Sequence, residues 1–311
     1  MTPMARIVFI FPGQGSQSVG MGKSFFDQSE EARRLFARAD DVLGFPLSKM
    51  CFEGPEEELR LTRNTQPALL LVSTVAFRLL GRTPAAAAGH SLGEYSAHVA
   101  AGTIGFEDAL NLVRKRGIYM QEAVPVGVGA MAALLGADYE AVNEACLRAE
   151  GGQVRIANWN SPEQIVISGH KAAVEDVVKR VKAVKAVMLP VSAPFHSPLM
   201  QSAEDRLAAD LAAVEFKDPA FPVITNVDAR MIRTGAEARD ALRRQVSRPV
   251  LWSKAMDLLA GEDIDAFVEL GPGKVLSGLI RRIGKGWARP FSVLNAEDAA
   301  SLGKAAAALN A

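Results

Sequence analysis

A serine surrounded by small residues is the first feature of this chain that could carry chemistry. Ser91 lies in GHSLG, residues 89–93, which matches the pattern G-x-S-x-G and follows four alanines. In that pattern a strand turns sharply into a helix and holds the serine hydroxyl clear of the sheet. The N–H of the next residue, Leu92, then faces the place where an oxyanion would form. We predict that Ser91 is a nucleophile; the alternative is an incidental serine in a Gly-rich turn.

A nucleophilic serine needs a base, and the chain has four histidines. We expect His90 to point to the other side of the turn, and His98 to pack or face solvent, because it lies about 10 Å further along the helix. His170, at the start of a later helix, is typical of a capping or solvent-exposed residue. His196 lies between two prolines, and the Ser-Pro after it indicates a helix N-terminus, whose positive potential favours a neutral imidazole. We predict that His196 is the base; the alternative is a structural histidine in a rigid loop.

Arg116 has an unusual setting. If residues 107–122 form a helix, its neighbours on the same face are all apolar: Ala109, Leu112, Val113, Tyr119 and Met120. A guanidinium there needs a partner. Arg116 could extend to solvent, pair with an internal carboxylate, or clamp a substrate carboxylate through two hydrogen bonds.

The loop FPGQGSQSVGMGKS, residues 11–24, is rich in glycine and follows the first apolar run. Its spacing fits neither a Walker A motif nor G-x-G-x-x-G, so we do not expect nucleotide binding. A loop at the carboxyl end of a strand can instead supply a second oxyanion donor. The backbone N–H of Gln14 is the candidate.

The elements that must position these residues follow an α/β pattern, in which short apolar runs alternate with longer helical stretches and the sheet is mainly parallel. Helices are expected at residues 65–81, with Thr65 as N-cap, at 107–122, and directly after Ser91. Strands are expected at residues 7–11, 85–88, 223–226, 266–270 and 291–294.

Between about residues 129 and 192 the order of predicted elements becomes βαββαβ, which is typical of a ferredoxin-like unit. We therefore predict a discontinuous large subdomain with an α/β-hydrolase-like fold, residues 1–126 and 196–311. Residues 127–195 would form the inserted small subdomain.

Composition narrows the function classes. The 311 residues contain 35 Lys plus Arg and 35 Asp plus Glu, so no broad charge footprint for nucleic acid or an anionic membrane is present. Cys51 and Cys146 fit neither a disulfide framework nor a zinc spacing, which favours a reducing compartment. The apolar run at residues 7–11 is too short for a signal peptide core or a membrane span. We expect a cytoplasmic monomer with no metal and no cofactor.

Several separated motifs together resemble the malonyl-CoA:acyl carrier protein transacylase family of fatty acid synthesis, and the resemblance covers essentially the whole chain. These motifs are FPGQGSQ (11–17), GHSLGEYSA (89–97), RGIYMQEA (116–123), NSPEQIVISG (160–169), HSPLM (196–200), RRQVSRPVLW (243–252) and FVELGPGKVL (267–276). The resemblance implies the two-subdomain fold described above. It also implies a ping-pong reaction that moves malonyl from coenzyme A to a serine and then to the phosphopantetheine thiol of acyl carrier protein.

The resemblance also implies roles for individual residues. Ser91 would be the nucleophile and His196 the general base and acid, while Arg116 would bind the malonyl carboxylate. Gln14 and Leu92 would supply the oxyanion amides. Gln245 would line the site and orient the histidine through its backbone carbonyl.

Two alternatives stay open at this point. A serine esterase or thioesterase would share the serine and histidine, but its histidine usually lies near the C-terminus, whereas 115 residues follow position 196 here. A non-catalytic scaffold that binds carrier protein would be expected to have lost the nucleophile or the base.

Overall fold

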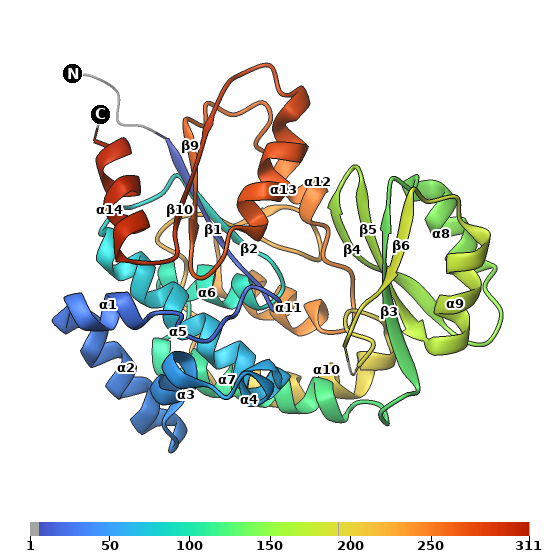
Figure 1. The fold of residues 1–311 in the computed structure, drawn as a ribbon, viewed down its shortest axis with the longest axis horizontal. Coiled ribbons are helices and arrows are strands. Elements are labelled where there is room, and N and C mark those ends of the chain that lie inside the picture. Colours follow the sequence, from blue (N-terminus) through green and yellow to red (C-terminus); the bar gives the residue numbers. More distant parts are fainter. Residues whose placement is uncertain (1–5, 192, 311) are drawn as a thin grey trace.

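The computed structural model describes residues 6–191 and 193–310. The outermost residues of the predicted large subdomain, 1–5 and 311, and position 192 at the end of the predicted insert lie outside this range. The described chain contains two sheets, one of six strands and one of four (Figure 1).

The larger sheet has the order β10-β9-β1-β2-β7-β8. Its first five strands pair in parallel, and β7 and β8 form an antiparallel pair at one edge. The strands are β1 (Ile7–Phe11), β2 (Ala86–Gly89), β7 (Val223–Ile224), β8 (Met231–Ile232), β9 (Ala266–Leu270) and β10 (Ser292–Ala296). The predicted mainly parallel α/β class is confirmed, and β8 is an addition that the apolar pattern did not indicate.

Both faces of this sheet are covered by helices. Alternation along β1 sends Phe9 and Phe11 into one core and Val8 and Ile10 into the other. The first face carries α5 (Thr62–Leu80), α6 (Leu92–Ala100) and α7 (Phe106–Glu122), and the second carries α12 (Trp252–Asp257) and α13 (Val275–Ile283). A strand buried on both sides explains why β1 is apolar throughout.

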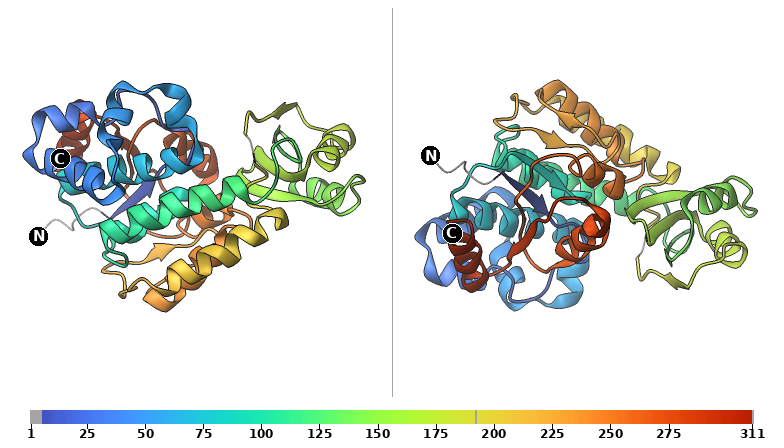
Figure 2. Two further views of the ribbon diagram at one scale, coloured as in Figure 1. Left: turned by 90° about the horizontal axis from the view of Figure 1, so that it is seen from below. Right: turned by 90° about the horizontal axis from the view of Figure 1, so that it is seen from above.

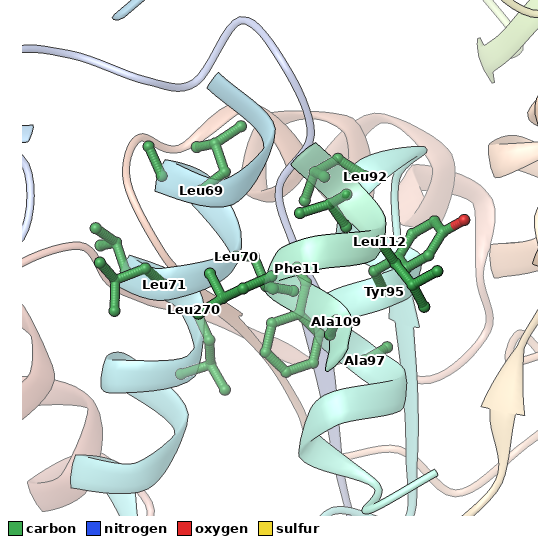
Figure 3. Close-up of a cluster of buried hydrophobic side chains, with 14 of the residues drawn as sticks. Phe11, Leu69, Leu70, Leu71, Leu92, Tyr95, Ala97, Ala109, Leu112 and Leu270 are labelled. Atoms are coloured by element: carbon green, nitrogen blue, oxygen red, sulfur yellow. The ribbon is translucent and has the colours of Figure 1, made fainter. Parts of the chain in front are cut away.

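The first core joins these three helices to the sheet (Figure 3). Its labelled members are Leu69, Leu70 and Leu71 of α5, Leu92, Tyr95 and Ala97 of α6, Ala109 and Leu112 of α7, Phe11 of β1 and Leu270 of β9. Because α6 begins directly after Ser91, this packing fixes the start of that helix relative to the sheet.

The remaining elements of this part of the chain surround that core. They are α1 (Lys23–Gln28), α2 (Glu30–Leu43), α3 (Leu47–Glu53), α4 (Glu56–Arg60), α10 (Gln201–Ala212), α11 (Gly235–Gln245) and α14 (Ala299–Ala308), with short 3-10 turns at Pro198–Met200 and Gly284–Gly286.

Helix α5 begins three residues earlier than predicted, so the prediction of Thr65 as its N-cap is wrong. The hydroxyl of Thr65 donates instead to the carbonyl of Leu59. Pro67 therefore lies inside the helix, where it cannot donate to the carbonyl of Arg63. The guanidinium of Arg114 donates to that carbonyl at 3.0 Å, which explains why the helix continues through the proline.

The four-stranded sheet has the order β4-β5-β3-β6 and is antiparallel throughout. Its elements are β3 (Gly129–Leu135), α8 (Tyr139–Leu147), β4 (Val154–Ser161), β5 (Gln164–His170), α9 (Lys171–Arg180) and β6 (Lys185–Met188). The order βαββαβ agrees with the ferredoxin-like pattern. The subdomain boundaries themselves stay a prediction.

The smaller sheet and its two helices project from one end of the molecule in both views of Figure 2. Two backbone hydrogen bonds connect β4 to the segment before α12. The N–H of Trp159 donates to the carbonyl of Val250 at 2.9 Å, and the N–H of Val250 donates to Ala157 at 2.8 Å. The inserted unit is thus joined to the larger one by hydrogen bonds as well as by the chain itself.

Candidate active site

Ser91 occupies a strained turn between β2 and α6. Its φ of 52° and ψ of −107° are rare for a residue with a side chain. The turn is possible because its flanks lack Cβ atoms: one on Gly89 would lie 1.9 Å from the carbonyl carbon of Gly93, and one on Gly93 would lie 2.0 Å from the carbonyl oxygen of Phe11. The small residues around the serine therefore serve close backbone packing, as the pattern predicts.

The structure brings His196 to Ser91. The Nε2 of His196 lies 2.7 Å from the Oγ of Ser91, and its Nδ1 lies 2.8 Å from the backbone carbonyl of Gln245. A carbonyl only accepts, so Nδ1 carries the proton and Nε2 presents a lone pair to the serine hydroxyl. This is the arrangement that a general base requires.

His196 is neutral in this environment. Burial, followed by the positive charge of Arg116, lowers the pKa of His196 to about 3. The 3-10 turn Pro198–Met200 follows it as the Ser-Pro pair indicated, but burial and the arginine are the principal causes of its neutrality. His196 also has a positive φ of 56°, so both members of the pair lie on strained backbone.

Arg116 is buried beside the nucleophile with only 1% of its surface exposed. Its Nη2 donates to the Oγ of Ser91 at 3.2 Å and to the side-chain oxygen of Gln245 at 2.8 Å, and its Nη1 donates to Gln66 at 2.8 Å. Burial lowers the pKa of Arg116. Among the described residues no carboxylate makes a direct hydrogen bond to Arg116, and its Nε has no acceptor. Of the three alternatives, a direct ion pair with an internal carboxylate is therefore not observed; the nearest link to one runs through Gln245 to Glu94.

A cavity of about 140 Å³ lies above the serine. Both candidate oxyanion residues, Gln14 and Leu92, contribute to its wall. The N–H of Leu92 belongs to the first residue of α6 and so has no acceptor within the helix. The other lining residues are Gln66, His90, Ser91, Arg116, Met120, Met131, Asn158, Leu189, Val191, Phe195 and His196.

Gln245 lies differently from expectation. It is fully buried and is not part of the cavity wall, because its side chain is hydrogen-bonded to Arg116 and to the backbone carbonyl of Ser91.

His90 contributes to the cavity wall, but its ring does not bond the serine. Its Nε2 lies 2.8 Å from the Oδ1 of Asn160, and the ring packs against Trp252 of the second core, in line with the expectation that it points away from Ser91.

The remaining histidines take no part in this site. His98 is buried in the core. His170 precedes α9 without capping it, and its Nδ1 accepts from the backbone N–H of Gln153.

Asn226 and Glu94 contact the site, and neither was predicted from the sequence. The Oδ1 of Asn226 accepts from the N–H of Ser91 at 2.7 Å, and its Nδ2 donates to the carbonyl of Gly89 at 2.7 Å, so one side chain clamps both sides of the turn. The signal was present, because Asn226 follows β7, which neighbours β2 in the sheet. Glu94 lies three residues after the nucleophile and is completely buried.

Neither a cluster of metal-ligating side chains nor a membrane-spanning helix is present among the described residues. No group of three or more His, Cys, Asp or Glu side chains in that part of the chain could hold a metal ion. No helix of residues 6–191 and 193–310 combines the length and apolarity needed to cross a bilayer.

The tight turn that carries Ser91, called the elbow below, lies at the carboxyl edge of a mainly parallel sheet, and a neutral histidine is hydrogen-bonded to its serine. This arrangement defines the class of serine enzymes that transfer or hydrolyse acyl groups. The comparisons with known proteins narrow this class. Residues 8–308 match the acyl transferase domain family. The chain belongs to the malonyl-CoA–acyl carrier protein transacylases within it, and the resemblance seen in the sequence is confirmed.

Three relatives carry that assignment. A malonyl CoA-acyl carrier protein transacylase of Bacillus subtilis strain 168 is 48% identical over 290 residues, 91% of this chain and 92% of the relative. The crystal structure of an acyl carrier protein S-malonyltransferase from Vibrio cholerae superposes with a TM-score of 0.92 at 43% identity and covers 97% of this chain and 100% of its own. A malonyl-transacylase in complex with a type II PKS acyl-carrier protein gives 0.93 at 41% identity, with 98% and 100% covered.

Proposed function

We propose that this chain transfers a malonyl group from coenzyme A to the phosphopantetheine thiol of acyl carrier protein, through a covalent malonyl ester on Ser91, and so supplies fatty acid synthesis. The observation that carries this proposal is the guanidinium of Arg116. It is buried, makes no direct hydrogen bond to a carboxylate of the described residues and lies 3.2 Å from the nucleophilic oxygen. A substrate with a carboxylate close to its reacting carbonyl fits that position.

In the first half of the reaction, His196 Nε2 accepts the proton of the Ser91 hydroxyl as Oγ bonds to the thioester carbonyl carbon. The negative charge moves to the carbonyl oxygen, which the N–H groups of Leu92 and Gln14 stabilise. One such donor is typically worth about 3 to 4 kcal/mol in the transition state. The carbon–sulfur bond then breaks, and the coenzyme A sulfur takes the proton from the imidazolium.

The second half reverses these steps with a different thiol. His196 accepts the proton of the phosphopantetheine thiol as the sulfur bonds to the ester carbonyl, and the serine oxygen leaves with that proton. Gln245 supports both halves through its carbonyl, which keeps Nδ1 protonated and Nε2 free. No cofactor is required, since the coenzyme A thioester is itself the substrate.

The partner and the location belong to the same proposal. The solved complex of a related malonyl-transacylase with its acyl-carrier protein supports carrier protein as the second substrate. We propose that the chain acts in the cytoplasm as a monomer, which light scattering after gel filtration would test.

Mass spectrometry of the intact protein tests the reaction. After brief exposure to malonyl-CoA, we expect an adduct of malonyl mass that disappears when acyl carrier protein is added and reappears on the carrier. Ser91→Ala should form no adduct; an adduct on that variant would place the nucleophile elsewhere. An adduct lost equally fast without carrier would instead indicate a hydrolase.

A further inference from the structure

Glu94 is a buried carboxylate that the proposed reaction does not use. It lies in the first turn of α6, is fully buried and does not line the cavity. Its Oε2 accepts from the backbone N–H of Asn226 at 3.0 Å and from the side-chain Nε2 of Gln245 at 2.8 Å. Its Oε1 has no hydrogen-bond partner among the described residues. A buried carboxylate is costly, so its presence calls for a physical reason.

The side chain of Gln245 connects Glu94 to Arg116. An arginine can only donate and an ionised carboxylate can only accept, so the orientation of the amide is fixed. Its oxygen faces the guanidinium at 2.8 Å, and its nitrogen faces Oε2 of Glu94. One amide thus bridges a buried positive charge and a buried negative charge.

Hydrogen bonds from the side chain of Gln245 and the backbone N–H of Asn226 favour the ionised form of Glu94 most, and two charged groups act on it in opposite directions. Arg116, on α7, favours the ionised form of Glu94, and Asp228, in the loop after β7, opposes it. Asp228 itself accepts a bidentate pair of hydrogen bonds from the guanidinium of Arg244. From α11 the facing group is the neutral amide of Gln245. Without substrate, the buried arginine is therefore balanced by a carboxylate one amide away.

We propose that Glu94 is a positioning residue that acts through Gln245: it holds the guanidinium of Arg116 in place and competes, by its negative charge, with the carboxylate of the incoming acyl group. This inference rests on the proposed function, because it assumes that Arg116 receives a substrate carboxylate. Binding of that carboxylate puts a second negative charge beside the same guanidinium. The charge of Glu94 consequently weakens binding of acyl groups that carry a carboxylate and leaves uncharged acyl groups unaffected.

Protonation of Glu94 would relieve this competition. Burial raises the pKa of Glu94 to about 7, so its charge changes between pH 6 and pH 8. The malonyl carboxylate has an ordinary acidic pKa and stays ionised throughout that range. Binding of malonyl-CoA should therefore become tighter as the pH falls through 7, whereas binding of acetyl-CoA should not.

The test is the ratio of dissociation constants for malonyl-CoA and acetyl-CoA, measured by calorimetry in a Ser91→Ala background that cannot react. Glu94→Gln keeps the size of the side chain and an acceptor for Gln245 but removes the charge. At pH 8 we expect it to tighten malonyl-CoA binding on the order of tenfold, from loss of one charge near the arginine. Acetyl-CoA binding should change less than about twofold. At pH 6 the effect on malonyl-CoA should shrink.

The matched control is Glu269→Gln. Glu269 is another fully buried carboxylate, but it accepts from the backbone N–H groups of Leu276 and Ser277 at the start of α13 and does not line the cavity. This variant should leave the ratio unchanged. An unchanged or lowered preference for malonyl-CoA in Glu94→Gln at pH 8 would overturn the proposal.

A second measurement needs no substitution at position 94. In the Ser91→Ala protein itself, the preference for malonyl-CoA over acetyl-CoA should rise between pH 8 and pH 6, and acetyl-CoA corrects for titration of the shared coenzyme. A flat ratio would contradict the inference even if Glu94→Gln does not fold. Failure of the proposed function is recognised separately, because the unaltered protein would then form no malonyl adduct.

Discussion

The Oγ of Ser91 and the Nη2 of Arg116 lie 3.2 Å apart, although the two residues belong to different helices. Ser91 is at the start of α6, and Arg116 lies within α7. A group attached to that oxygen is therefore within reach of a buried cation. An acyl group with a distal carboxylate could pair with it directly, whereas an acetyl group would leave the guanidinium without a carboxylate in contact. We therefore expect these two residues to set both the reaction and the choice of substrate.

Arg116→Ala should separate these two effects. Loss of one partner of a buried charge pair typically costs about 2 to 5 kcal/mol, so malonyl loading should fall by at least about thirtyfold. Acetyl loading should fall little or rise, because no charge interaction is lost. Single-turnover loading followed by mass spectrometry measures both rates. Lys115→Ala, which removes a half-exposed charge paired with Asp210, is the control, and equal losses for the two acyl groups would exclude the clamp.

The neutrality of His196 has a consequence for pH dependence. A histidine with an ordinary pKa of 6.5 would lose most of its base form by pH 5, but the pKa of His196 is about 3. The neutral base is present above that value, so loading at saturating malonyl-CoA should keep its rate between pH 7 and pH 5. Stopped-flow release of coenzyme A measures it. A tenfold fall over that interval would show that the bound state restores an ordinary pKa, and His196→Ala should lower the rate about 10²- to 10⁴-fold.

The sequence predicted those features that depend on local pattern. Five consecutive apolar residues at 7–11 require burial, and the strand predicted there has the observed bounds. The tight turn that GHSLG requires marks the end of the next strand, whose predicted bounds are within one residue of those observed. Arg116 was also visible, because a cation on an apolar helix face is anomalous wherever the helix packs. The guanidinium of Arg116 is buried, as its position on an apolar face indicates.

The features that were missed depend on contacts between distant segments. Thr65 is a good N-cap residue, yet it donates to Leu59 because α5 starts earlier and packs against α7. Asn226 reaches the nucleophile from 135 positions away, and its place at the end of a predicted strand does not by itself show which turn it contacts. Gln245, 154 positions from Ser91, was found only through the resemblance of its motif. The partner of His90, Asn160, lies in the small sheet, and the sequence does not show that this sheet contacts the turn.

Close packing at the elbow predicts a large loss of stability for one added methyl group. In Gly93→Ala the new Cβ would lie 2.0 Å from a backbone oxygen of β1, which cannot rotate away. We expect a loss of more than about 3 kcal/mol or failure to fold, measured by urea unfolding. Gly303→Ala is the control: it lies in α14 with no atom within 4 Å of the added Cβ, and should gain up to about 1 kcal/mol. Similar effects of the two substitutions would mean that the turn adapts.

Glu94 also predicts how stability changes with pH. Its pKa is about 7 in the folded chain against an ordinary value of 4.5, so the folded state binds this proton more tightly than the unfolded state does. Stability from this group is complete below pH 4.5, falls as the pH rises and is lost above 7, a difference of about 3 kcal/mol. Glu94→Gln does not titrate, so its free energy of unfolding relative to the unaltered protein should increase between pH 5 and pH 8. Urea unfolding at both values measures this, with the exposed Glu57→Gln as control. A difference that is constant with pH would mean that Glu94 has the same pKa in the folded and unfolded states. The charge of Glu94 beside Arg116 would then not change near pH 7, contrary to the inference.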